Sequence, residues 1–379
     1  MLAFTTACLY IVQSNIRLEP LGEIMNPQIA SIRDGLHDGS YKKSSRFFTF
    51  GVARCMSAMV VAFSVSVFAQ TANDTIVTRA QVEKSIARGA LLWDVRAPSE
   101  YAKGHIPGAI SIGDASSVLR DANREDFISV AAIEQILGNA GIDPSREIVV
   151  YGNRGTWNPY FGLYTAQYFG GKSASVYHDG IDDWIEAAKP TESAATKLPP
   201  IALKLKVDAS RMASTREVIE KVGKANVQIL DVRTIDEFEG NDIRAIRGGH
   251  VPGAINIPYE RNWQDPDTLA KLGKKQVNSN VGMSLKPVEE LRKLYAALDK
   301  EKETIVYCQS GVRASESAGV LQQLGFKNVK IYDSSWLGYA STLDAPAEKV
   351  TFVNVGALQN RIQALQNRLD TLERDAVRK

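Results

Sequence analysis

The sequence lacks the features that mark membrane-spanning and nucleic-acid-binding proteins. An apolar run at residues 56–69 is about fourteen residues long, whereas a membrane-spanning helix needs about twenty. The charge is nearly balanced, with 45 Lys and Arg against 43 Asp and Glu, so the chain has no electrostatic attraction to a polyanion or a lipid surface. We therefore expect a globular protein with no nucleic-acid partner and no stable membrane anchor.

Residues 1–69 have the features of a leader with a secretory signal peptide. Basic residues precede the apolar run, and the run closes at Val67-Phe68-Ala69, which suits a cleavage site. Cleavage after Ala69 would export the mature chain to the periplasm or beyond it. The leader holds six Lys and Arg and four Asp and Glu, so 39 residues of each sign remain and the mature chain is neutral.

Cysteine is scarce in this chain. Cys8 and Cys55 fall in the leader, so Cys308 is the one thiol of the expected mature chain. It has no partner for an internal disulfide, and in an oxidising compartment a lone thiol is either buried or used. Composition alone leaves open whether Cys308 is a small core residue or a functional one.

The mature chain contains an internal duplication. Residues 94–110 read DVRAPSEYAKGHIPGAI, and residues 231–255 read DVRTIDEFEGNDIRAIRGGHVPGAI. The two copies share Asp-Val-Arg, a Glu, Gly-His and Pro-Gly-Ala-Ile, and the second has an eight-residue insertion before Gly249-His250. Such a match predicts two domains of the same fold.

Each copy shows apolar β-rich runs separated by helix-like stretches. Thr78 with Gln81 and Ser214 with Glu217 fit helix-capping boxes at the start of each copy. The expected strands are residues 91–95, 109–112, 148–151 and 175–177, then 227–232, 254–257, 304–307 and 329–332. Expected helices include residues 287–299 and 314–324. Buried strands alternating with helices predict an α/β fold in which a mainly parallel sheet is flanked by helices.

The predicted domain order is a leader at 1–69, domains at 73–188 and 209–347, and a Pro-containing linker at 189–208. After these, residues 355–379 form a predicted amphipathic helix. Its apolar residues are spaced by four, three, four and three: Leu358, Ile362, Leu365, Leu369 and Leu372. The helix either packs against its own domain or self-associates, and the pattern leaves both open.

The residues around Cys308 favour a catalytic role for it. The cysteine follows a buried strand and opens a loop, Cys308-Gln-Ser-Gly-Val-Arg313, that leads into a helix. Ligands of open α/β sheets bind at such strand ends. Gly311 lets successive amides turn inward, and with the helix dipole and Arg313 they favour a thiolate and a bound anion. Incidental packing of Cys308 is the alternative.

These motifs together resemble the tandem-domain rhodanese family, which includes thiosulfate and mercaptopyruvate sulfurtransferases. The resemblance covers about residues 75–345. It rests on the Cys-x-x-Gly-x-Arg loop, the paired Asp-x-Arg and Gly-His-x-Pro-Gly-Ala motifs, and Tyr332-Asp-Ser-Ser-Trp336. It implies that the Cys308 thiolate takes sulfur from a small anionic donor as a persulfide and passes it to cyanide or a thiol, without metal or organic cofactor.

The same resemblance assigns roles to further residues. Arg313 and Arg233 would bind the donor anion, with an ion pair as the alternative role of Arg233. Asp231 belongs to the motif that carries Arg233, and His250, like His105, is expected to hold a turn rather than to transfer protons. The remaining loop residues are expected to line the substrate site: Gln309, Ser310, Gly311 and Val312.

Two departures from the family bear on function. Thiosulfate-specific members carry Lys two residues after the cysteine, where this chain has Ser310, a residue similar to the mercaptopyruvate enzymes. The donor is therefore open between the two. In the first copy Gly152 stands where Cys308 would be, so that domain is predicted to be catalytically silent, and Trp157 and Tyr160 after it either pack locally or contact the active domain.

Two other functions compete with sulfurtransferase. Phosphatases of related fold have five residues between Cys and Arg, whereas residues 309–312 provide four, and the shorter loop suits sulfur better than a phosphoryl group. A carrier that relays persulfide sulfur without turnover needs the same thiolate. Turnover with thiosulfate and cyanide separates a carrier from an enzyme.

Overall fold

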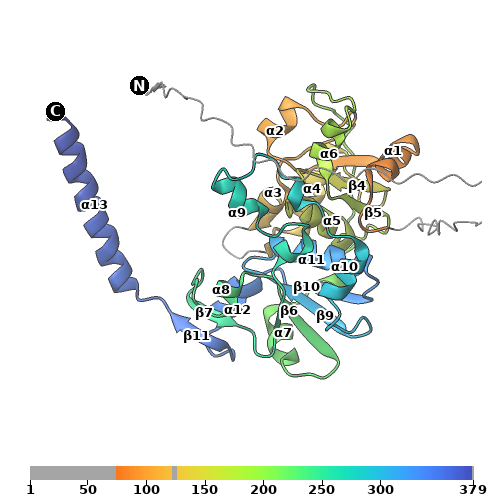
Figure 1. Ribbon diagram of the computed structural model, residues 1–379. Coiled ribbons are helices and arrows are strands. Elements are labelled where there is room, and N and C mark those ends of the chain that lie inside the picture. The colour runs from red at the N-terminus through yellow and green to blue at the C-terminus, as the bar shows by residue number, and fades with distance from the viewer. Residues whose placement is uncertain (1–73, 122–125, 378–379) are drawn as a thin grey trace, which may run out of the picture. The chain divides into compact units, whose positions relative to one another are not determined.

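The computed structural model describes residues 74–121 and 126–377 (Figure 1). The predicted leader and its cleavage site lie outside these residues. Within them, two sheets of parallel strands follow one another along the chain, each with helices between its strands. The predicted α/β class with duplicated, mainly parallel sheets is confirmed.

The first sheet has the strand order β1-β4-β5. Its strands are β1 (Leu91–Asp94), β4 (Ile148–Tyr151) and β5 (Ala174–Tyr177). Single bridges extend it, from Ile110 to Trp93 at one edge and from Ile76 to Val176 at the other. The strand expected at 109–112 is therefore reduced to that one bridge at Ile110.

The second sheet repeats this arrangement with the order β10-β9-β6-β8. Its strands are β6 (Val227–Asp231), β8 (Ile255–Asn256), β9 (Glu303–Tyr307) and β10 (Asn328–Ile331). Asp231 pairs with Tyr307 on the central strand, as Asp94 pairs with Tyr151 in the first sheet. The register makes Cys308 and Gly152 equivalent positions.

Helices connect the strands of both copies. In the first copy they are α1 (Arg79–Ala87), α2 (Pro98–Lys103), α3 (Ala115–Val118), α4 (Val130–Ala140), α5 (Asn158–Tyr168) and α6 (Gly180–Glu186). In the second they are α7 (Thr215–Lys221), α8 (Ile235–Phe238), α9 (Thr268–Gly273), α10 (Val288–Leu294), α11 (Val312–Gln323) and α12 (Ser335–Ser341), with short 3-10 turns η1 (Ala209–Arg211), η2 (Tyr259–Asn262) and η3 (Val281–Met283). Thr78 and Gln81 form the predicted capping box, whereas Ser214 accepts a bond from the Glu217 amide without the reciprocal one.

The largest cluster of buried apolar side chains contains residues from both copies, among them Val150 and Phe161 of the first and Val306 and Leu321 of the second. The segment 189–208 runs in irregular conformation and bonds to the first copy, for instance from the Ile201 amide to the Gly138 carbonyl at 2.9 Å.

Two small antiparallel ladders and a long helix complete the described residues. One ladder joins β7 (Arg247–His250) to β11 (Glu348–Phe352), and the other joins β2 (Arg120–Asp121) to β3 (Asp126–Phe127). The predicted C-terminal helix is α13 (Val355–Val377). In the part of the chain that the structure describes, no helix has the length and apolar character needed to cross a membrane.

Candidate active site

Cys308 lies directly after β9, at the carboxyl end of the central strand. Its backbone is held on both sides by the segment that follows β10. The Cys308 amide donates to the Ser335 hydroxyl at 3.1 Å, and its carbonyl accepts from the Trp336 amide at 3.0 Å. The residue is fully buried.

The loop after Cys308 turns because Gly311 adopts a left-handed conformation, with φ of +86°. A Cβ atom at Gly311 would lie 2.4 Å from both the carbonyl and a carboxylate oxygen of Asp333, so only glycine fits there. Among the described residues, no group accepts a hydrogen bond from the amides of Gln309, Ser310 or Gly311. These amides remain available to an anion in the loop.

Arg313 closes the loop and forms a paired contact with Glu237 of α8. Its two terminal nitrogens each donate to a carboxylate oxygen of Glu237 at 2.8 Å. Burial favours the neutral forms of both groups, but the hydrogen bonds and charge of Arg313 bring the pKa of Glu237 down to about 2. Burial lowers the pKa of Arg313, but the hydrogen bonds and charge of Glu237 outweigh this effect and raise that pKa, so the guanidinium stays charged.

Arg244 is a second cation at this loop, and the sequence analysis missed it. Its carbonyl accepts a hydrogen bond from the Gln309 side chain at 2.6 Å, and its guanidinium lies 3.4 Å from Glu237. Its side chain is 52% exposed, so it can meet a donor arriving from solvent. The sequence feature that could have pointed to Arg244 is the eight-residue insertion. This insertion contains Arg244 and occurs only in the copy that has the cysteine.

Arg233 is positioned differently from the expected donor ligand. Its guanidinium binds both carboxylate oxygens of Asp231, at 2.6 to 3.1 Å, and the Gly249 carbonyl at 2.8 Å. It also lies over the Trp336 ring, 4.8 Å from the centroid, and its side chain is 1% exposed. Donor binding by Arg233 stays a prediction, and these contacts tie the end of β6 to β7.

The other predicted site residues surround this arrangement. Ser310 is half-buried in the loop, and the Val312 side chain packs against the apolar core. His250 stacks on Phe238 at 3.6 Å between ring centroids and bonds to the Phe238 carbonyl and to Glu348. His105 has the same position in the first copy, stacked on Tyr101 at 3.7 Å and bonded to its carbonyl.

The equivalent loop of the first copy has no space for a nucleophile. A Cβ at Gly152 would lie 2.9 Å from the Pro159 side chain. The glycine that corresponds to Gly311 is Gly155, and Met283 of the second copy packs against it, with its side chain 2.4 Å from where a Cβ would be. The His178 ring forms a hydrogen bond with the Met283 carbonyl at 2.8 Å, and this bond holds Met283 against Gly155.

The first copy also contacts the second near the active loop. Trp157 meets Tyr259 edge to face at 5.7 Å between centroids, and the Tyr160 ring lies against Gly319 of α11. Arg120 donates to the carboxylate of Asp333 at 3.1 Å, next to Gly311. A buried charge of the first copy thus positions Asp333, which lies against the loop at Gly311.

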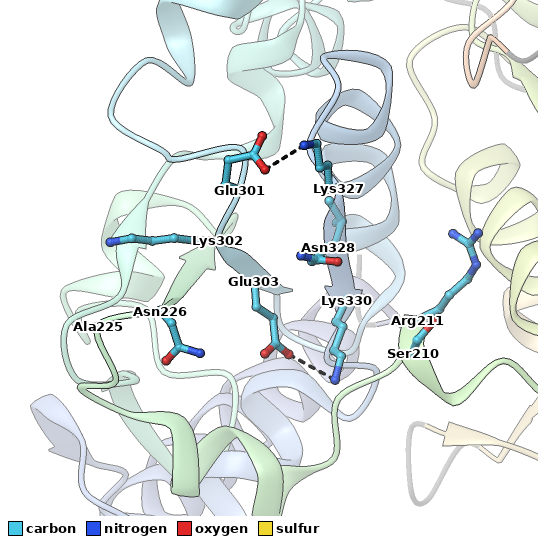
Figure 2. A pocket seen from close by; sticks show the side chains of 11 residues that line it. Ser210, Arg211, Ala225, Asn226, Glu301, Lys302, Glu303, Lys327, Asn328 and Lys330 are labelled. Atoms are coloured by element: carbon cyan, nitrogen blue, oxygen red, sulfur yellow. Dashed lines mark hydrogen bonds and ion pairs between the residues drawn. The ribbon is translucent and has the colours of Figure 1, made fainter.

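A cleft of about 740 Å³ lies elsewhere, at the amino ends of β9 and β10 (Figure 2). Two of the three lysines that line it form ion pairs, Lys327 with Glu301 and Lys330 with Glu303. It lies at the strand ends opposite those that lead to Cys308. Within the two described ranges, no group of three or more His, Cys, Asp or Glu side chains could hold a metal ion.

Comparison with known proteins identifies relatives of both copies. The sequence profile of the Rhodanese-like domain matches residues 78–187 and 214–342. A Mycolicibacterium smegmatis protein named "Putative thiosulfate sulfurtransferase" is 34% identical over 262 residues, which cover 66% of this chain and 88% of that protein. The thiosulfate sulfurtransferase of Corynebacterium glutamicum is 32% identical over 271 residues, covering 68% and 82%.

Solved structures share the fold at lower identity. The anaerobic ergothioneine biosynthesis enzyme of Chlorobium limicola, in complex with trimethyl histidine, matches with a TM-score of 0.61 and 18% identity. An EanB variant with a cysteine persulfide and ergothioneine matches with the same score and identity. Each match covers 74% of this chain and 71% of the other, and identity this low is evidence of the fold alone.

Proposed function

Because this chain belongs to the rhodanese family, we propose that it moves sulfane sulfur from thiosulfate to cyanide or a thiol through a persulfide on Cys308. The single observation that carries the proposal is the loop at residues 308–313. It holds a cysteine, three amides without a hydrogen-bond acceptor among the described residues, and a guanidinium, all within six residues. This arrangement suits a thiolate and a small dianion.

The reaction has two displacements. In the first, the Cys308 thiolate attacks the outer sulfur of thiosulfate, the sulfur–sulfur bond breaks, and sulfite leaves with the bonding electrons. In the second, cyanide or a thiolate attacks the outer sulfur of the persulfide, forming thiocyanate or a new persulfide and returning the Cys308 thiolate. The protein ends unchanged, and ping-pong kinetics follow.

Two cations beside the loop bind the anionic donor in this proposal. Arg313 and Arg244 share the one carboxylate of Glu237, so these three side chains together carry one net positive charge. The same charge stabilises the sulfite leaving group as it forms. Thiosulfate-specific members of the family have a Lys at the position of Ser310. In this chain Arg244, which lies in the insertion, supplies the equivalent positive charge.

Mercaptopyruvate is the second candidate donor, favoured by Ser310. It carries one carboxylate, and its carbonyl can accept a hydrogen bond from a hydroxyl. A third reading is a persulfide carrier that passes sulfur to a partner such as a thioredoxin-like protein. We further propose that the protein acts in the periplasm or outside the cell, on the evidence of the basic and apolar pattern at residues 42–69.

Steady-state assays separate these readings. We expect many turnovers with thiosulfate and cyanide and a higher kcat/KM for thiosulfate than for mercaptopyruvate. A higher kcat/KM for mercaptopyruvate than for thiosulfate would identify mercaptopyruvate as the preferred donor. One equivalent of thiocyanate per chain, with no further release, would show a carrier instead of an enzyme.

A further inference from the structure

The helix α13 (Val355–Val377) presents an unpartnered apolar seam. Every residue from 354 to 376 is exposed, including the apolar ones. The seam side chains are between 49% and 58% exposed: Val355, Leu358, Ile362, Leu365, Leu369 and Leu372. An apolar stripe this regular on a helix in solvent is typical of a surface that another helix covers.

We propose that the seam of α13 binds the same helix of a second copy of this chain, as a parallel two-stranded coiled coil. The seam residues repeat every seven positions. Val355, Ile362 and Leu369 occupy the first core position of successive heptads, and the second holds leucine each time: Leu358, Leu365 and Leu372. Two of the three first positions hold a β-branched residue, Val355 and Ile362, and this choice with leucine at the second position favours two parallel strands.

Charge complementarity along the seam supports a second copy as the partner. In a parallel pair, the residue immediately before each first core position faces the residue five positions further along the partner helix. Arg368 then faces Glu373 of the partner, and the symmetry of the dimer forms this pair twice. Arg361 faces Gln366 of the partner, which can accept its hydrogen bonds.

The antiparallel alternative is less favourable. If all six seam layers were kept in register, Arg361 would lie beside Arg368 of the partner, again twice, and like charges would repel. The orientation of the pair is therefore set by charge, because the apolar seam itself is nearly symmetric along its length.

The outer face of α13 argues against a lipid surface as the occupant. Membrane-surface helices carry Lys and Arg on the polar face and often Trp or Phe on the apolar one. Here three Arg are balanced by three acidic residues, and the helix contains no aromatic residue. Its polar face is instead rich in Gln and Asn, such as Gln363, which bonds to Asn367 at 3.1 Å.

The first test is sedimentation equilibrium of the purified chain and of two matched variants. Ile362→Asp with Leu365→Asp places two charges in the seam, and Asn360→Asp with Gln363→Asp places the same two charges, three residues apart, on the outer face. We expect the parent and the outer-face variant to be dimers. The dimer dissociation constant of the seam variant should be higher than theirs by about 100-fold or more. A monomeric parent, a trimer, or a seam variant that dimerises normally would overturn the proposal.

The second test addresses charge and orientation. Arg368→Glu and Glu373→Arg should each weaken the dimer, and the two together should restore it. The variant Leu358→Cys with Leu369→Cys should form links between equal positions of the two chains, identified by peptide mapping. Links between positions 358 and 369, or a double charge variant as weak as the singles, would refute the parallel pair. Binding of monomeric chain to phosphatidylglycerol vesicles would assign the seam to lipid.

Discussion

At the residue scale, two guanidinium groups share one carboxylate beside the loop. Glu237 accepts two hydrogen bonds from Arg313 and lies 3.4 Å from Arg244, so it fixes one guanidinium firmly and holds the other loosely. The side chain of Arg313 is 14% exposed, whereas that of Arg244 is 52% exposed to solvent. This division suggests that Arg313 acts on the bound anion and Arg244 on its capture.

Substituting Arg244 tests this division. Arg244→Ala should raise the KM for thiosulfate about tenfold and leave kcat within a small factor, since a charge-assisted contact is lost while the loop keeps its shape. Arg216→Ala is the control, because its side chain is 88% exposed and pairs only with Glu220 on α7. An unchanged KM in Arg244→Ala, measured at constant ionic strength, would remove Arg244 from donor capture.

Glu237 also predicts a pH dependence of stability. Its pKa is about 2 in the folded protein and near 4.3 in an unfolded chain, so the folded state holds the carboxylate more strongly than the unfolded state. The stabilisation is complete above about pH 4.3 and is lost as the pH falls towards 2. Urea unfolding of the parent should show this decline.

Glu237→Gln should be less stable than the parent at neutral pH, because Arg313 loses its anion, and the difference should shrink as the pH falls through that window. If the free-energy difference between the two proteins were the same at pH 6 and pH 3, Glu237 would not be the titrating group.

At the scale of elements, the catalytic loop depends on backbone shape as much as on side chains. Gly311 and Gly325 have nearly the same left-handed φ, +86° and +89°, but their surroundings differ. A Cβ would strike Asp333 at Gly311 and would meet nothing within 4 Å at Gly325. The two glycines therefore separate backbone strain from steric contact.

Gly325→Ala should lower the free energy of unfolding by about 1–2 kcal/mol and leave sulfur transfer intact, since it introduces only the strain of a left-handed alanine. Gly311→Ala should cost a further 1–3 kcal/mol or so, because the loop must move away from Asp333, and should lose most of the activity. Thermal unfolding and turnover of both proteins measure the two effects. Equal losses in both would mean that the contact with Asp333 does not shape the loop.

Local sequence patterns predicted the buried strands well and the paired edges poorly. The run at residues 148–151 became β4 without change, because four consecutive apolar residues need burial on both faces. The ladder between β7 and β11 was missed, since Arg247 and Phe352 are far apart in sequence and neither segment alternates clearly. Short strands of this kind form because a distant partner is present, and no local pattern records that partner.

At the scale of the whole molecule, both copies keep the parallel sheet, and they differ at the position of Cys308. Both copies retain the Asp-Arg pair with the same geometry, Arg96 on Asp94 and Arg233 on Asp231, each at 2.6 Å in the shortest contact. Only the second kept a nucleophile. The first now provides contacts to the catalytic loop, such as Arg120 on Asp333.

We predict that more than the missing thiol prevents the first copy from transferring sulfur. Gly152→Cys, made together with Cys308→Ser, should not restore sulfur transfer, because the new side chain would meet Pro159 and Trp157 stands where the loop needs its arginine. Turnover with thiosulfate, and circular dichroism to show a folded protein, measure this. A double variant with activity would show that the first copy lacks only the thiol.

The sequence predicts the loop at residues 308–313 and the missing cysteine of the first copy because each rests on residue types at fixed spacing. It did not identify Arg244, Ser335 or Asp333 as parts of the site, because their roles depend on contacts across the loop. Ser335 accepts from the Cys308 amide while holding φ of +49°, a strained conformation for serine. Nothing in the motif Tyr332-Asp-Ser-Ser-Trp336 states that contact in advance.

The most direct measurement of the central claim is the intact mass of the purified chain after incubation with thiosulfate and no acceptor. We predict a gain of one sulfur atom, mapped to the peptide that contains Cys308, removed by cyanide with release of one equivalent of thiocyanate, and absent in Cys308→Ser. No added sulfur on the parent chain, or the same addition and turnover in Cys308→Ser, would contradict the account.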